Sequence, residues 1–461
     1  MRFSHTNPVA AASFDDPNLI AAAGVVPVMG LATSCSLADL ADEWLTIPTD
    51  KGAHPGAKVS ALVTGMVMGA DSIADMGVLR HGAMGTLFDR TYAPSTLGSF
   101  LRMFTYGHTR QLDAVATRFL GELTRQTSLL GDLSNPSASV MLDIDDTVIE
   151  VHGYGKQGAQ VGYTGTRGLN VLLTTLTAPG RAPVICGQRL RRGARGSSHG
   201  AASMITSALK TLTRLRPTTT APPVLVRADS AFYSYDMVRA CLAHGAHVSI
   251  TLRRQPDVLR AIANIDATAW TPITYTRPVY DPDTHTVVHR AQVAATPFTA
   301  FTGNMSGKKP VPGHLIVRRV PDEQSTQTGE LFPIWRYHAF FTSQPDPDPV
   351  TADAIHRGHA IIENVHADLK NGPLAHLPSA QFAANNAWLT CAVIAFNLSR
   401  AAGCVAGMTT ATTATVRRTL ISIAARISRS ARRVTLHLPR DWPWQPYWQN
   451  LFDHTHHRKP A

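Results

Sequence analysis

Acidic side chains interrupt two segments that are otherwise typical of buried β-strands. Asp143, Asp145 and Asp146 lie within one apolar run, and Asp229 ends a second. An unpaired carboxylate is costly to bury, so such strands rarely carry acids without a function. Because side chains alternate along a strand, Asp143 and Asp145 share one face and Asp146 lies on the other. The pattern indicates a carboxylate-based site and leaves open whether Asp143 or Asp145 is its first acid.

A third group of ionisable residues lies in a segment predicted to form one long helix over 353–369. Its members follow one another at offsets of 3, 4, 3 and 4 residues: His356, His359, Glu363, His366 and Lys370. This spacing places all five on one stripe of an α-helix. Such a stripe is typical of a solvated face, and its ligand types would also suit zinc. Zinc is the weaker interpretation, because the HExxH order is absent and no cysteine lies nearby.

The order of the acids resembles the catalytic core of DDE insertion-sequence transposases, which is RNase H-like. The segment 145–147 (Asp-Asp-Thr) resembles the first-acid segment of that family, and 227–233 resembles the end of its second-acid strand. The gaps are 84 residues from Asp145 to Asp229 and 134 residues from Asp229 to Glu363. The second gap is too long for a bare core, which agrees with the β-domain that one branch of the family inserts before its glutamate.

The predicted helix resembles the signature of that branch, Tyr-x2-Arg-x3-Glu-x6-Lys. Glu363 and Lys370 match its last two positions, whereas His356 and His359 stand at the Tyr and Arg positions. The role of the two histidines therefore stays open. By resemblance, the DNA contacts of this helix are Lys370, His359 and His356.

The resemblance implies a transposase that binds the ends of an insertion sequence and catalyses DNA cleavage and strand transfer. Asp145, Asp229 and Glu363 would be the catalytic acids and would bind two Mg²⁺ or Mn²⁺ ions, since hard oxygen ligands suit these metals. The implied partners are double-stranded DNA (terminal inverted repeats and target) and a second copy of the chain in a synaptic dimer. We expect a cytoplasmic, nucleoid-associated bacterial protein without a membrane partner.

Two alternatives remain open at this point. The segment 143–147 (Asp-Ile-Asp-Asp-Thr) also resembles the DxDxT motif of haloacid-dehalogenase-like phosphatases, with Asp143 and Asp145 in the pocket. That fold continues with a parallel βαβ arrangement, whereas 150–176 is predicted to form a hairpin. The other alternative is a catalytically inactive DNA-binding derivative of a transposase, against which the presence of all three acids argues.

The pattern along the chain predicts an α/β protein with an RNase H-like mixed sheet flanked by helices, a β-rich insertion, a helical N-terminal domain and a helical C-terminal segment. Residues 1–135 are predicted to be a helical DNA-binding domain. The catalytic core is predicted over 136–265 and 346–402, with the β-rich insertion at 266–345 between them. Residues 403–461 form a basic C-terminal region.

The charge balance fits a polyanionic partner. The chain has 43 Lys and Arg against 32 Asp and Glu, a net charge of +11, which predicts binding to nucleic acid or an anionic surface. Arginines that follow the third strand could line an active-site groove: Arg189, Arg191, Arg192 and Arg195. Arg102 ends a helix that could belong to a helix-turn-helix reader. The stretch 416–433 has six arginines and no acid and is predicted to be a helix that contacts phosphates.

Composition excludes several other classes of protein. With 461 residues, 44% of them hydrophobic and 16% charged, the chain can bury a large core, so it is not mainly disordered. Its five cysteines are scattered and form no CxxC pair, which argues against a disulfide framework or a zinc ribbon. The most apolar segment, 382–398, is broken by three asparagines and is predicted to be a buried helix.

Overall fold

The N-terminal region of the protein is helical, as the sequence predicts. The computed structural model describes residues 11–133, 140–216, 223–281, 286–303, 309–321, 335–431 and 433–456. The first helices are α1 (Val25–Ser34), α2 (Leu37–Trp44), α3 (Pro55–Met68), α4 (Pro94–Arg102) and α5 (Tyr106–Gln126). Pro55 and Pro94 occupy the first turn of their helices, where a missing N–H leaves no hydrogen bond unmade.

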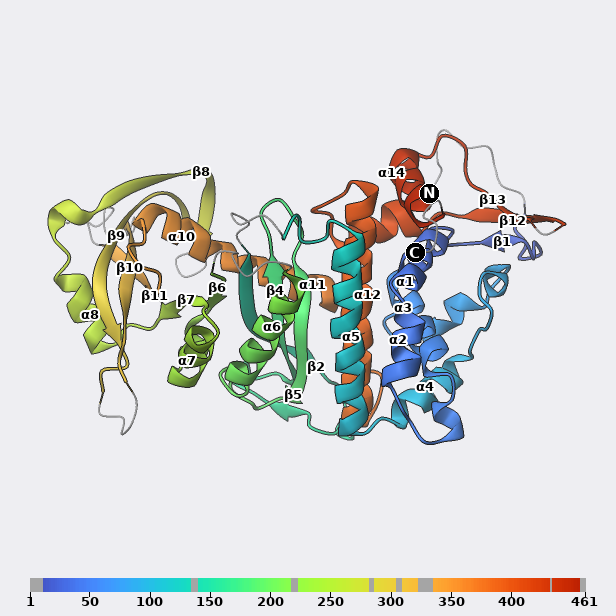
Figure 1. The fold of residues 1–461 in the computed structure, drawn as a ribbon, viewed down its shortest axis with the longest axis horizontal. Coiled ribbons are helices and arrows are strands. Elements are labelled where there is room, and N and C mark those ends of the chain that lie inside the picture. The colour runs from blue at the N-terminus through green and yellow to red at the C-terminus, as the bar shows by residue number, and fades with distance from the viewer. Residues whose placement is uncertain are drawn as a thin grey trace.

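A ten-stranded mixed sheet extends from the middle of the molecule to one of its ends (Figure 1). Its first six strands are β2 (Met141–Glu150), β3 (Gln160–Val161), β4 (Arg167–Thr177), β5 (Val184–Arg192), β6 (Leu225–Ala228) and β7 (His247–Leu252). β2, β4 and β5 are antiparallel neighbours, whereas β6 and β7 run parallel to β2, which gives the order β5-β4-β2-β6-β7. β4 and β6 are buried along almost their whole length, as expected for strands covered on both faces.

The β-rich segment before the glutamate helix extends this sheet. It contains β8 (Thr271–Asp281), β9 (Thr286–Ala300), β10 (Val311–Pro321) and β11 (Trp335–Thr342), and β11 pairs antiparallel with β7. Figure 1 shows these strands at one end of the molecule, with the N-terminal helices at the other. The inserted strands therefore continue the mixed sheet away from the acids instead of folding over them.

The remaining helices before the C-terminal region are α6 (Ala201–Leu215), α7 (Tyr235–Ala243), α8 (Pro256–Ala263), α10 (Pro349–Arg357) and α11 (Ile361–Lys370). The prediction of one continuous helix over 353–369 is wrong, because a 3-10 turn at Gly358–Ala360 separates α10 from α11. Glycine weakens a helix interior, and a 3-10 stretch inside a helix marks a local change of geometry. The break divides the histidine and glutamate stripe between two helices.

A long apolar helix, α12 (Phe382–Ala406), lies between the N-terminal helices and the sheet (Figure 1). It packs against α3, α5 and β5, and 94% of its most apolar stretch is buried. This is the single helix in the described ranges that is long and apolar enough to cross a membrane. Its burial confirms the prediction of a core helix. One hydrophobic core consequently connects the N-terminal helices with the sheet.

The basic C-terminal stretch is not the helix that the sequence analysis predicts. After α13 (Thr413–Val416) the chain makes a π-helical turn at Arg417–Ile421 and then a hairpin of β12 (Ala425–Ser430) and β13 (Arg433–His437). β12 also pairs with β1 (Leu19–Ile20), and α14 (Gln445–His456) follows. The physical reason is a period of two: residues 421, 423, 425 and 427 are buried, and those between them are exposed.

Candidate active site

The acids on strand β2 alternate between two faces of the sheet, as predicted. On one face, the fully buried Asp143 pairs with Arg227, which stands opposite it on β6. Arg227 Nε and Nη2 donate to the two oxygens of Asp143 at 2.7 and 2.8 Å. His359 Nδ1 lies 2.9 Å from Oδ1 of the same carboxylate. Asp143 is therefore fully occupied by protein donors.

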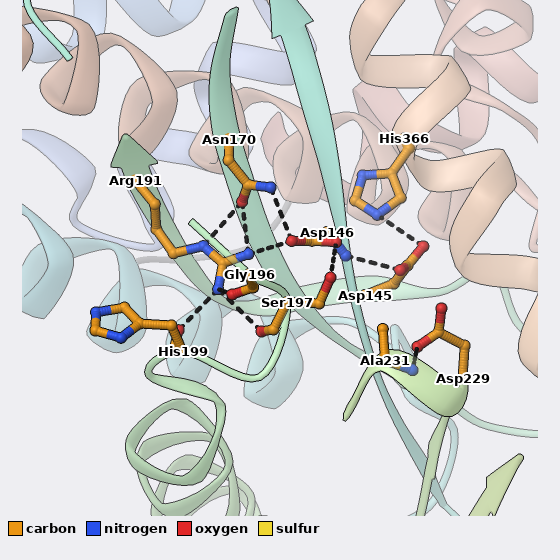
Figure 2. Close-up of polar contacts among 10 residues, drawn as sticks. All are labelled: Asp145, Asp146, Asn170, Arg191, Gly196, Ser197, His199, Asp229, Ala231 and His366. Carbon is orange, nitrogen blue, oxygen red and sulfur yellow. Dashed lines mark hydrogen bonds and ion pairs between the residues drawn. The ribbon is translucent and has the colours of Figure 1, made fainter. Parts of the chain in front are cut away.

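On the opposite face, Asp146 is equally enclosed (Figure 2). Arg191 on β5 forms an ion pair with it, and both side chains are 3% exposed. Asn170 Nδ2 and Ser197 Oγ donate to the carboxylate at 2.8 and 3.0 Å. Arg191 Nη1 donates to backbone carbonyls of the loop that follows β5, including that of His199 at 2.7 Å. This network ties the loop 193–200 to the strand that bears the acids.

Asp145 and Asp229 have no arginine partner among the described residues, and Figure 2 shows their carboxylates next to each other. Asp145 accepts a hydrogen bond from the backbone N–H of Asp146, and its Oδ2 lies 3.4 Å from Nε2 of His366. Asp229 directly follows β6 and accepts from the N–H of Ala231 at 2.9 Å. Burial, and next the negative charge of Asp145, raise the pKa of Asp229. Two neighbouring carboxylates without a buried cation form an electrostatic environment that favours a bound metal ion.

Glu363 lies on α11 with its side chain exposed, and in the described chain it makes no hydrogen bond or ion pair. Its helix nevertheless faces Asp145. His366 contacts that carboxylate, and the charge of Asp145 opposes the burial that lowers the pKa of Lys370. Glu363 precedes these residues by three and seven positions, so it lies on the same face of the helix. No group of three or more His, Cys, Asp or Glu in the described ranges is already arranged to hold a metal.

The two histidines at the Tyr and Arg signature positions are turned inward. His356 stacks on Phe340 with ring centroids 4.0 Å apart and contacts the hydroxyls of Ser249 and Thr251 at 2.8 and 3.0 Å. Burial and nearby positive groups lower its pKa to about 3, which keeps the ring neutral. Such an environment does not favour the predicted DNA contact of His356. His359 reaches Asp143, which gives it a partner within the protein.

The predicted groove arginines separate into two kinds. Arg191 is buried in the Asp146 network, and Arg189 is half-buried with its guanidinium on Ser203 Oγ at 3.0 Å. Arg192 and Arg195 are exposed beside the same loop. Arg102 is exposed on α4, which Figure 1 places at the end of the molecule remote from β2. Of the four predicted groove arginines, only Arg192 and Arg195 are exposed.

The structure adds residues that the sequence analysis missed. A groove of about 430 Å³ runs along the end of β2 and is lined by Asp146, Tyr163, Thr164 and Lys370, among others. Burial, and next the negative charges of Asp146, Asp145 and Asp229, raise the pKa of Tyr163. Arg227 could have been identified from the sequence as the partner of a buried acid. An arginine in an otherwise apolar strand needs a carboxylate as much as a buried acid needs a cation.

Comparison with known protein families assigns the chain to one of them. The family described as "Transposase DDE domain group 1" matches residues 4–459. The chain belongs to this family of DDE transposases. No curated protein matches it at a significant level.

Membership in this family replaces the phosphatase interpretation. The haloacid-dehalogenase motif requires a parallel βαβ continuation, whereas β2 continues into the antiparallel strands β4 and β5. Asp143, one of the two acids that a phosphatase would use, is enclosed by Arg227 and His359. The zinc interpretation also fails within the described ranges, because His356, His359 and His366 have different partners.

Proposed function

We propose that the protein is a transposase that binds the ends of an insertion sequence and catalyses metal-dependent DNA strand cleavage and strand transfer, with Asp145, Asp229 and Glu363 as its catalytic acids. The observation that carries this proposal is the contrast within one strand. Asp143 and Asp146 are each neutralised by a buried arginine, whereas Asp145 faces Asp229 without one.

The strand order supports an RNase H-like core. Three antiparallel strands followed by two strands parallel to the first, in the order β5-β4-β2-β6-β7, are the arrangement that this fold requires. Asp145 then lies on the first strand of this core, β2, and Asp229 directly follows its fourth strand, β6. Both acids reach the same region of the sheet because β2 and β6 are adjacent and parallel.

The family generally uses divalent metals, and the donor set fits such an ion. Asp145 and Asp229 offer oxygen atoms in a region of excess negative charge, and Glu363 lies on the helix face that addresses Asp145. Oxygen ligands suit Mg²⁺ or Mn²⁺, and we propose two ions. When bound, a metal pair supplies activation of the attacking oxygen and stabilisation of the leaving oxygen at a phosphodiester.

The chemistry that the protein side chains serve consists of two in-line displacements. Water attacks the phosphodiester at the element end, which breaks its bond to the 3′-oxygen and leaves a 3′-hydroxyl on the element and a 5′-phosphate on the flanking strand. That hydroxyl then attacks a phosphodiester of the target, which joins the two strands and releases a 3′-hydroxyl of the target strand. We propose that Lys370, Arg192 and Arg195 contact DNA phosphates, which would orient the strand without reading its sequence. We propose a homodimer that holds two DNA ends, in the bacterial cytoplasm on the nucleoid.

The test is cleavage of a duplex that ends in the inverted repeat of the element encoding the protein, with Mg²⁺ present. We expect Asp145→Ala, Asp229→Ala and Glu363→Ala to abolish cleavage while DNA binding persists. Asp39→Ala, which removes an exposed acid on α2, is the matched control and should cleave normally. Native-rate cleavage by any one of the three variants refutes the role of that acid. DNA binding without cleavage by the unmodified protein favours the inactive derivative.

A further inference from the structure

Asp143 lies two residues before the proposed catalytic Asp145 but has a different environment. Its side chain is 0% exposed, and its partners Arg227 and His359 are 5% and 15% exposed. Three nitrogen atoms from these two residues lie within 2.9 Å of its two oxygens. Because a carboxylate oxygen only accepts hydrogen bonds, His359 must carry its hydrogen on Nδ1 here. We call these three residues the Asp143 cluster.

Arg227 extends the Asp143 cluster to the end of helix α10. Its Nη1 donates to the backbone carbonyl of Ile355 at 2.6 Å. The same nitrogen lies where a side chain at position 358 would begin, since a Cβ atom on Gly358 would stand 2.6 Å from it. The glycine at the helix break thus leaves space for the guanidinium to reach the carbonyl.

The Asp143 cluster joins the three segments that carry the proposed catalytic acids. Asp143 is on β2 with Asp145, Arg227 is two residues before Asp229, and His359 is four residues before Glu363. A rigid contact close to each acid fixes the distances between the strands and the helix. The fit between Arg227 and Gly358 adds a steric constraint at the same place.

We propose that His359 is a positioning residue, which through Asp143 and Arg227 holds the helix bearing Glu363 against the strands bearing Asp145 and Asp229. The proposal rests on the proposed function. It assigns to the signature position occupied by His359 a contact within the protein in place of a contact with DNA.

The test compares two substitutions at one position. In His359→Asn the side-chain amide can still donate to Asp143 from near the position of Nδ1, whereas His359→Ala removes the donor. At saturating DNA and Mg²⁺ we expect His359→Ala to lower the cleavage rate by on the order of a hundredfold, since small displacements of reacting groups have effects of this size. The affinity for the DNA end should stay within about twofold, and His359→Asn should restore most of the rate.

A matched control removes a histidine that faces a carboxylate on the surface. His376 Nδ1 lies 3.5 Å from Asp71, and its side chain is 67% exposed, so His376→Ala should leave rate and affinity unchanged. Hydrogen exchange supplies a readout that needs no activity. In His359→Ala, amides of residues 355–366 should exchange faster, with no change in the N-terminal helices.

The outcomes separate the two proposals. Weaker DNA binding by His359→Ala, with an unchanged rate at saturation, overturns the positioning role and restores the DNA contact. Equal losses in His359→Asn and His359→Ala also contradict it, because the amide retains the donor. If the unmodified protein cleaves no DNA but exchange in 355–366 rises in His359→Ala, the proposed function fails while the positioning contact stands.

Discussion

Four carboxylates lie at two adjacent strands, three on β2 and one directly after β6, yet they form two contrasting pairs. Asp143 and Asp146 point to opposite faces of β2, and each faces a buried arginine. Asp145 and Asp229 instead face each other, and the charge of the first contributes to the raised pKa of the second. The comparison teaches that acids of one residue type differ here in whether a buried arginine faces them. Under the proposed function, this difference separates the structural acids from the catalytic ones.

Each arginine-bound pair fixes a different part of the surroundings of the proposed site. The pair on one face holds the α10–α11 segment, and the pair on the other face holds the loop 193–200. A buried ion pair contributes little net stability over an apolar pair, but breaking it leaves an uncompensated charge. The two pairs are therefore best tested by removing one partner at a time.

The largest effect is expected from Arg191→Met. This substitution leaves Asp146 buried without its cation, which should lower the free energy of unfolding by about 3–5 kcal/mol. Urea denaturation at neutral pH measures the loss. The double variant Asp146→Asn/Arg191→Met removes both charges and should recover a substantial part of it.

A matched control for this prediction is Arg125→Met. Arg125 pairs with Glu122 on the surface, where the two side chains are 67% and 30% exposed, so the expected loss is at most about 0.5 kcal/mol. If both single variants lose the same stability, the Asp146 pair has no special structural role. The comparison between bound and unbound acids would then lose one of its two sides.

A smaller effect is expected from Mg²⁺ at the pair without arginine. At ten times its dissociation constant, an ion that binds only the folded protein raises the free energy of unfolding by about 1.4 kcal/mol. Thermal unfolding with and without Mg²⁺, followed by addition of a chelator, measures the shift. Asp145→Asn should abolish most of it, whereas Asp39→Ala should keep it. An undiminished shift in Asp145→Asn places the ion elsewhere.

Much of this arrangement could be predicted from the sequence, because local patterns determined it. The apolar strands with their acids, the helical N-terminal region and the β-rich segment all follow from side-chain periodicity. The two-residue period that is typical of a strand is also present at 421–427, where alternate residues are buried. The density of arginines in this stretch favours a helix, but the stretch forms a hairpin. The strand that pairs with this hairpin, β1, lies about 400 residues away in the chain.

The partners of the acids could not be predicted in the same way. Strand alternation correctly predicts that Asp143 and Asp145 share one face. It could not show that Arg227 pairs with Asp143 and not with Asp145. That choice depends on the register between β2 and β6, in which Asp143 stands opposite Arg227. Register is a long-range property, so the same face of one strand came to hold a structural acid and a proposed catalytic acid.

The smallest predicted effect tests whether the surroundings of Asp229 disfavour its ionised form. Because its pKa is raised in the folded protein, the protonated form is favoured there. The resulting stability is fully present below the unfolded pKa of about 3.9 and is lost as the pH rises through the folded pKa. Asp229→Asn does not titrate, so without metal its stability relative to the unmodified protein should increase from pH 4 to pH 7.

Asp266→Asn is the control with the opposite sign. Hydrogen bonds from Thr268 lower the pKa of Asp266 at the surface, so its ionised form is the favoured one. The relative stability of that variant should fall as the pH rises towards the unfolded pKa of about 3.9 and should stay level from pH 4 to pH 7, because the unmodified side chain gains from ionisation only below that pKa. If Asp229→Asn follows the same falling trend, Asp229 is stabilised as an anion by protein groups. It would then belong with Asp143 and Asp146, and the pair proposed to bind metal would be reduced to Asp145 alone.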